Sequence, residues 1–177
     1  TWDKLGSMGW MFVPLTEYHG GGETATIEPL DDHRDHYEKM LFSNLGAGVQ
    51  ACYRGPRLFD SEATKKMVQK TIVWYKKHRA ILESDLIHLR RPDGRDLDYW
   101  LTVNPHEKEK GMLMVFNPLD ETVKKTIRVP LYYTGLTDKV KVIFEDGRSE
   151  IKKLNRKYEL NLDIEVIGGR YTWITFE

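Results

Sequence analysis

Hydrophobic positions along this chain change their period near residue 83. Before that point, apolar runs at residues 8–15 and 48–53 are each followed by a long segment with apolar residues every three or four positions. That order predicts a strand and then a helix, twice. After residue 83, short segments alternate between apolar and polar residues and are separated by turn residues, which is typical of antiparallel strands.

The first strand-helix unit begins with a nearly continuous apolar run at residues 9–15, as in a strand that is buried on both faces. Three glycines at residues 20–22 then give the following loop wide backbone freedom. Pro29 and Asp31 are start signals for a helix, and Gly46 is placed to end it. The expected apolar face of this helix contains Leu30, Tyr37, Met40, Leu41 and Leu45.

The second unit repeats this order. Residues 48–53 are rich in small side chains, which the crowded interior of a barrel accepts, and residues 54–57 form the exit loop. Asp60 or Ser61 is expected to cap the next helix. The residues expected on its apolar face are Met67, Val68, Thr71, Trp74, Tyr75, His78, Ile81 and Leu82.

The second half of the chain predicts an antiparallel β-sandwich or small barrel. Turn signals such as Pro92-Asp93-Gly94, Asn117-Pro118, Asp146-Gly147 and Gly168-Gly169 separate its candidate strands. The expected strands are residues 86–90, 99–103, 111–117, 123–129, 140–145, 150–154, 158–166 and 171–176. The fold class is therefore α/β plus all-β, with the last two βα units of a TIM-type barrel in residues 1–83 and an antiparallel sandwich in residues 84–177.

The composition of the chain limits which classes of molecule it is expected to bind. The chain has 177 residues, with 40% hydrophobic and 31% charged, and its acidic and basic residues balance over the whole sequence and within each half. We therefore expect no nucleic-acid partner and no membrane partner. The single cysteine, Cys52, excludes a disulfide within the chain and is best explained by packing in its strand.

Several segments resemble the carboxyl end of α-galactosidase-type (melibiase-like) glycoside hydrolases. They are residues 74–82 (WYKKHRAIL), 85–90 (DLIHLR), 111–118 (GMLMVFNP) and 169–173 (GRYTW), in the same order relative to the predicted strands and helices. The resemblance implies the seventh and eighth barrel units, a C-terminal sandwich that braces the barrel, and a retaining-type α-glycosidase acting on O-glycosidic bonds. It also implies a parent protein that is secreted or periplasmic; the residues themselves leave the localisation unknown.

The resemblance places both catalytic aspartates on earlier barrel strands, before Thr1. The catalytic residues are thus unknown, this chain alone is expected to be inactive, and no metal or other cofactor is expected. Glu17 is the only carboxylate that we can place at a strand exit. It is a candidate for catalysis or for binding a sugar hydroxyl, and pairing with Arg54 or Arg57 is at least as good an explanation.

Barrel loops bind ligands, so residues at the two strand exits are candidates for shaping a carbohydrate substrate. They are Glu17, Tyr18, His19, Tyr53, Arg54 and Arg57. His19 is also explained by a hydrogen bond within its loop, and the two arginines by salt bridges to a neighbouring barrel unit. A quarter of a barrel cannot close its own sheet. We therefore expect the rest to come from another polypeptide or another copy of the chain, or to have been removed by cleavage or by the choice of expressed segment.

Other motifs predict little chemistry. His19 and the three following glycines spell the oxyanion-hole sequence of lipases, but no serine lies in a Gly-x-Ser-x-Gly context. His33 and His36, one helical turn apart, could hold a surface metal, but a solvated polar face explains them better.

A rival hypothesis is a non-catalytic carbohydrate-binding or structural sandwich. Its candidate aromatic residues are Trp100, Tyr132, Tyr133, Tyr158, Tyr171 and Trp173. Aromatic residues in alternating strands usually belong to the core, and we expect that of most of these. Two or three coplanar rings facing solvent would favour binding.

Overall fold

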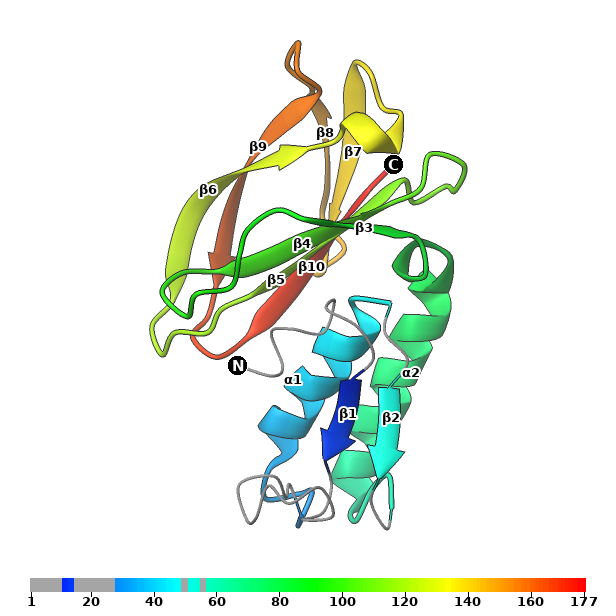
Figure 1. Ribbon diagram of the computed structural model, residues 1–177, viewed down its shortest axis with the longest axis vertical. Coiled ribbons are helices and arrows are strands. Elements are labelled where there is room, and N and C mark those ends of the chain that lie inside the picture. The colour runs from blue at the N-terminus through cyan, green and yellow to red at the C-terminus, as the bar shows by residue number, and fades with distance from the viewer. Residues whose placement is uncertain (1–10, 15–27, 49–50, 55–56) are drawn as a thin grey trace. The chain divides into compact units, whose positions relative to one another are not determined.

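The computed structural model describes residues 11–14, 28–48, 51–54 and 57–177, with the backbone alone for 11–14 and 51–54 (Figure 1). The chain divides into two compact units, Thr1–Arg79 and Ala80–Glu177. The sequence pattern predicted a boundary between residues 83 and 84. None of the helices in the described part of the chain is long and apolar enough to cross a membrane.

The first unit contains two parallel strands, β1 (Met11–Pro14) and β2 (Ala51–Arg54). Their register runs from Met11 opposite Ala51 to Pro14 opposite Arg54. Parallel neighbours need a crossover connection, and the segment that contains α1 (Arg34–Leu45) supplies it. The described strands form a two-stranded sheet. The strand-helix-strand order predicted from the sequence is therefore present, while the closed barrel is not part of what the structure describes.

The start of α1 differs from the prediction, and its end confirms it. The helix begins at Arg34, and residues 30–33 form turns, with the N–H of His33 donating to the carbonyl of Leu30 at 3.2 Å. The helix ends at Leu45 with Gly46 as its C-cap, as predicted; Gly46 has a right-handed φ of −68° and donates to the carbonyl of Phe42 at 2.8 Å. The left-handed residue is Gly48, with a φ of +68°, so this glycine belongs to the turn after the helix and not to the predicted strand.

Helix α2 (Glu62–Leu82) begins with a reciprocal capping box. The N–H of Thr64 donates to Ser61 Oγ at 3.1 Å, and the N–H of Ser61 donates to Thr64 Oγ1 at 3.0 Å. The predicted apolar face is confirmed, since all of its members are buried except the half-buried Tyr75. The ring of Trp74 packs against that of Phe42, 4.5 Å between centroids. Leu30, Tyr37, Met40, Leu41, Met67 and Val68 form an apolar core in this unit.

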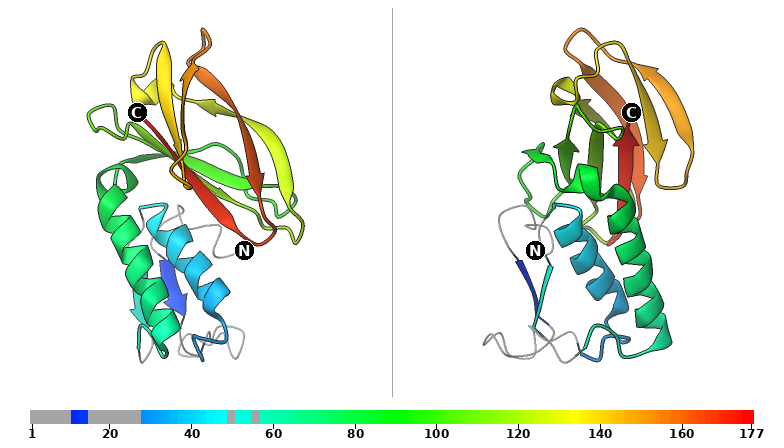
Figure 2. Two further views of the ribbon diagram at one scale, coloured as in Figure 1. Left: turned by 180° about the vertical axis from the view of Figure 1, so that it is seen from behind. Right: turned by 90° about the vertical axis from the view of Figure 1, so that its right-hand side faces the viewer.

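The second unit is an antiparallel sandwich, and every strand predicted for it forms, with small shifts at the ends. The strands are β3 (Asp85–His88), β4 (Asp98–Val103), β5 (Gly111–Phe116), β6 (Val123–Pro130), β7 (Lys139–Phe144), β8 (Ser149–Lys153), β9 (Glu159–Val166) and β10 (Tyr171–Phe176). One sheet has six strands in the order β3-β4-β5-β10-β7-β8, and the other pairs β6 with β9. Figure 2 shows the sandwich from two further sides.

The core of the sandwich is one apolar layer between the two sheets. From the two-stranded sheet it takes alternate residues of β6 and β9, such as Ile127 and Leu162, and from the six-stranded sheet residues such as Leu113, Val142 and Ile174. Strand β9 alternates buried and exposed positions as a half-buried strand should, whereas all six residues of β5 are buried. The other face of the larger sheet carries an aromatic cluster. The ring of Trp100 stacks on that of Phe116, with 5.1 Å between the ring centroids, and the ring of Phe116 contacts that of Tyr171, with 5.6 Å between the centroids.

A buried asparagine joins two connections of the sandwich. The side-chain amide of Asn117 donates to the carbonyls of Glu121 and Val166, at 2.8 Å each. The turn between β9 and β10 is thereby held against the segment after β5, and Gly168 lies at the point of contact. A Cβ added to Gly168 would lie 2.0 Å from the carbonyl oxygen of Asp120, so that position admits glycine alone.

We expect Gly168→Ala to lower the free energy of unfolding by about 3 kcal/mol, because the methyl group must push backbone atoms apart. Gly94→Ala is the matched control: Gly94 has a φ of +70° and open space around it, so strain alone costs about 1 kcal/mol. Urea unfolding of both variants measures the difference. If both variants lost the same free energy of unfolding, the contact with Asp120 would not be the reason that position 168 requires glycine.

Candidate functional site

The carboxyl ends of β1 and β2 define the candidate site, because parallel strands leave their sheet at the same edge. Tyr53 and Arg54 end β2, and their backbone lies beside that of Val13 and Pro14. Glu17, Tyr18 and His19 lie outside the described residues, so their role stays a prediction. Arg57 is the only predicted site residue whose side chain the structure describes.

Arg57 forms a two-point ion pair with Glu28. Its Nη2 donates to Glu28 Oε2 at 2.9 Å and its Nε to Oε1 at 3.3 Å, and this pairing raises the pKa of the guanidinium. The salt bridge proposed as one explanation of Arg57 is therefore present, to a residue of the connection that follows β1. Half of the arginine side chain, 52%, remains exposed, so contact with a sugar stays a prediction beside it.

Further hydrogen bonds join the same two connections. The N–H of Asp31 donates to Asp60 Oδ2 at 3.2 Å, and Ser61 Oγ donates to Asp31 Oδ1 at 2.9 Å. The Tyr37 hydroxyl donates to the carbonyl of Leu58 at 3.0 Å. We call this set, with the Arg57–Glu28 pair, the loop clamp. It fixes the segment before α1 to the segment before α2, and sequence reasoning missed it because its partners lie 21 to 30 positions apart.

Asp60 is the charged centre of the loop clamp. Partial burial raises the pKa of its carboxyl group, but the hydrogen bonds from the backbone of Asp31 and the hydroxyl of Thr64 outweigh this effect. The net result is a pKa below the ordinary aspartate value. Asp60 is therefore a structural anion that caps and joins loops, and not a candidate general acid.

Two apolar side chains of the same segment face solvent. Leu58 and Phe59 are each 44% exposed, and the ammonium group of Lys65 lies 5.7 Å from the centre of the Phe59 ring. Exposed apolar side chains beside a clamped loop can contact a ligand or another polypeptide. They extend the candidate site beyond the residues that the sequence pattern indicated.

The loop clamp predicts a pH dependence. The lowered pKa of Asp60 means that its stabilising effect is complete above the ordinary aspartate pKa of about 4 and is lost as the pH falls through the lower folded-state value. At pH 6, we expect Asp60→Asn to cost about 1 kcal/mol, because an amide nitrogen cannot accept the bond from Asp31. Near pH 3 the difference from the unmodified chain should shrink.

Thermal unfolding followed by circular dichroism at both pH values measures this effect. Asp32→Asn is the control, because Asp32 is an exposed carboxylate in the same segment. A loss for Asp60→Asn that is the same at pH 6 and pH 3 would rule out the charge as its cause.

The structure gives no support to the metal hypothesis. Both His33 and His36 are exposed, and no group of three or more potential ligands occurs among the described residues.

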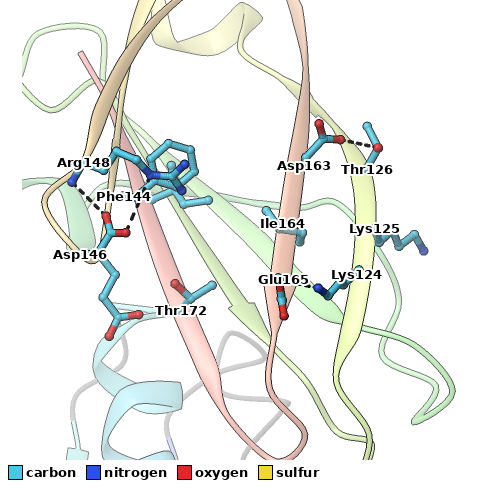
Figure 3. A pocket seen from close by; sticks show the side chains of 12 residues that line it. Lys124, Lys125, Thr126, Phe144, Asp146, Arg148, Asp163, Ile164, Glu165 and Thr172 are labelled. Carbon is cyan, nitrogen blue, oxygen red and sulfur yellow. Dashed lines mark hydrogen bonds and ion pairs between the residues drawn. The ribbon is translucent and has the colours of Figure 1, made fainter.

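The sandwich contains a groove of about 910 Å³ (Figure 3). Residues 124–126 of β6, residues 163–165 of β9 and the turn after β7 line it. Phe144 forms part of its wall, and Arg148 lies over that ring, 4.2 Å from its centre. Lys124 pairs with Glu165 at 3.1 Å, and Thr126 donates to Asp163. Since these wall side chains already pair with one another, we assign the groove no catalytic role.

The aromatic residues of the rival hypothesis fall into two groups. Trp100 and Tyr171 are buried, at 3% and 9% exposure, and Trp173 is half-buried, as expected for core residues. The expectation is wrong for Tyr132 and Tyr133, which are 62% and 65% exposed. Their rings meet edge to face, at 84°, and are therefore not coplanar.

Comparisons of sequence give no family: no family model matches the chain, and no curated protein does. Solved structures do match. A GH27 β-L-arabinopyranosidase from Geobacillus stearothermophilus has a TM-score of 0.56 at 13% identity, covering 100% of this chain and 42% of that one. An α-amylase from Geobacillus thermoleovorans has a TM-score of 0.52 at 10% identity, covering 84% and 35%. The galactosidase domain of an α-galactosidase-sucrose kinase has a TM-score of 0.50 at 17% identity, covering 78% and 19%.

These identities establish a likeness of fold to parts of glycoside hydrolases. The chain spans less than half the length of each of these structures. They include amylase-type as well as galactosidase-type enzymes, so the likeness does not by itself choose a substrate.

Proposed function

We propose that this chain is the C-terminal portion of an α-galactosidase-like glycoside hydrolase. Residues 1–83 supply the last two βα units of a TIM-type barrel, and the sandwich braces that barrel. The observation that carries the proposal is the order of elements, a parallel strand-helix pair followed by an antiparallel sandwich, in a fold that resembles glycoside hydrolases.

The catalytic carboxyl groups belong to the part of the barrel that this chain does not contain. A glycosidase needs two carboxyl groups roughly 5–10 Å apart on either side of the sugar bond. Among the described residues near the edge of β1 and β2, Glu28 is paired with Arg57, and Asp31 and Asp60 belong to the loop clamp. Glu17, the candidate that the sequence pattern placed at this edge, lies outside the described residues.

The chain's own contribution is to shape the substrate site. In the proposal, Tyr18, His19, Tyr53, Arg54 and Arg57 contact the sugar, because aromatic rings cover its apolar faces and guanidinium groups donate to its oxygens. The loop clamp supports this role by holding the segments after β1 and β2 in one fixed relation. The remaining barrel segment, or another copy of the chain, is the required partner.

The second candidate is a non-catalytic carbohydrate-binding or structural sandwich. The exposure of Tyr132 and Tyr133 favours it, but their edge-to-face arrangement does not form the flat platform that such modules use. This second candidate also assigns no role to the parallel strands β1 and β2. The glycosidase proposal accounts for both units and is therefore the better explanation.

The proposal predicts a separation of activities. The 177-residue chain should not hydrolyse aryl α-galactosides, aryl N-acetyl-α-galactosaminides or aryl β-L-arabinopyranosides, whereas the native material that contains it should hydrolyse at least one of them. Intact-mass measurement and light scattering should then find additional polypeptide, or a second copy of the chain, in the active material. The proposal would be contradicted if the isolated monomeric chain hydrolysed any of these glycosides, or if neither the chain nor the native material hydrolysed any of them.

In active material, we expect Tyr18→Ala, His19→Ala and Arg54→Ala each to raise KM by about tenfold, since each removes one contact with substrate. Lys66→Ala, an exposed change on α2, is the control and should leave KM unchanged. Steady-state kinetics on the best aryl glycoside measures these values. Unchanged KM in all three variants would remove the assigned sugar contacts.

A further inference from the structure

The ion pair between Arg57 and Glu28 is asymmetric in its exposure to solvent. The side chain of Glu28 is 16% exposed, whereas that of Arg57 is 52% exposed. Glu28 lies in the connection that follows β1, and Arg57 lies in the connection that follows β2. The more buried carboxylate therefore holds the guanidinium group from the protein side, and the arginine is the partner that a ligand can reach.

Glu28 occupies one edge of the guanidinium group and leaves another edge open. Of the five N–H groups of an arginine, one on Nε and one on Nη2 donate to the Glu28 carboxylate. The N–H groups of Nη1 have no partner among the described residues. Nη1 and the second N–H of Nη2 together form a pair of parallel donors, which fits two neighbouring oxygen atoms. We call this pair of donors the free fork.

The free fork has little freedom to change its orientation. The two-point bond to Glu28 fixes the plane of the guanidinium group. The backbone beside it is also fixed, because the carbonyl of Leu58 accepts from the Tyr37 hydroxyl at 3.0 Å. A donor pair that is already oriented loses little entropy when it binds a ligand.

The charges around the free fork disfavour an anionic ligand. The hydrogen bond to Glu28 is the largest cause of the raised pKa of Arg57, and the negative charge of Asp60 adds to it. Asp31, the third carboxylate of the loop clamp, lies 3.4 Å from the guanidinium group of Arg34. Three carboxylates and two guanidinium groups give these five side chains a net charge of −1. The positive charge of Arg57 is thus fully balanced by its neighbours.

We propose that Glu28 is a positioning residue for Arg57, and that the free fork donates to two adjacent hydroxyl oxygens of a neutral sugar and selects against a sugar carboxylate. This inference deepens the proposed glycosidase function and rests on it. An arginine without a partner prefers a carboxylate to a hydroxyl group, and Glu28 removes that preference. Leu58 and Phe59 directly follow Arg57 and are each 44% exposed, so apolar surface for the C–H groups of a sugar lies beside the free fork in sequence.

Inhibition of the active native material by galactose and by galacturonate tests the proposal. Galacturonate carries a carboxylate where galactose carries a hydroxymethyl group, so the two differ in charge. We expect galactose to inhibit hydrolysis of the best aryl glycoside with an inhibition constant about tenfold lower than that of galacturonate. Glu28→Gln should raise the constant for galactose about fivefold, because the free fork is no longer held. The same variant should lower the constant for galacturonate about fivefold, because the charge of Arg57 is no longer balanced.

Glu62→Gln is the matched control. Glu62 pairs with Lys65 at 3.4 Å, so the variant removes one carboxylate and one ion pair at the start of α2 and leaves the Arg57–Glu28 pair in place. Both inhibition constants should stay unchanged. Arg57→Lys tests the free fork separately, because lysine keeps the charge and has no planar pair of donors. It should raise the constant for galactose about tenfold and change that for galacturonate little.

Three results would overturn the proposal. They are equal inhibition of the unmodified material by the two sugars, a shift of both constants in the same direction in Glu28→Gln, and an unchanged constant for galactose in Arg57→Lys. The third applies even if Glu28→Gln does not fold. Hydrolysis with unaltered inhibition would remove this inference and leave the glycosidase role intact, whereas absence of hydrolysis by all material would remove both.

Discussion

The parallel pairing of β1 with β2 is the constraint on which the first unit depends. Parallel strands cannot be joined by a tight turn, so the chain must cross over through α1, and both strands then leave the sheet at one edge. The connections that follow the strands meet there, and the loop clamp fixes them through Asp31, Asp60 and the Arg57–Glu28 pair. A two-stranded parallel sheet also leaves ladder groups at its outer edges, which is the physical reason for proposing that further strands complete a barrel.

The sandwich is organised by a different physical rule. Its stability comes from one apolar layer between the sheets. Alternate residues of β6 and β9 face solvent, so the residues on the outer surface are free to vary. The polar groove and the exposed Tyr132 and Tyr133 both lie on that variable surface, at opposite ends of β6 and β9. The groove contains charged side chains that already pair with each other, such as Lys124 with Glu165.

Likeness of fold and residue chemistry answer different questions here. The fold resembles parts of glycoside hydrolases, and those enzymes act on different sugars. The substrate must therefore be inferred from the chemistry of the residues at the strand exits. The described residues there include a salt-bridged arginine, a structural aspartate and two exposed apolar side chains. None of these described residues forms a pair of catalytic carboxyl groups.

The sequence by itself determined the two-unit organisation, the buried face of α2 and the strands of the sandwich, because periodicity reports local geometry and burial directly. It failed at the start of α1, which begins at Arg34, and at Gly48, which lies in the turn after the helix and not in the predicted strand, since turn chemistry is decided by neighbours outside the pattern. Only the tertiary structure decided which tyrosines face solvent, that Gly168 lies against Asp120, and that Arg57 pairs with Glu28. The last two are contacts between residues far apart along the chain, and the exposure of a side chain likewise depends on the elements that pack around it; no local pattern encodes either.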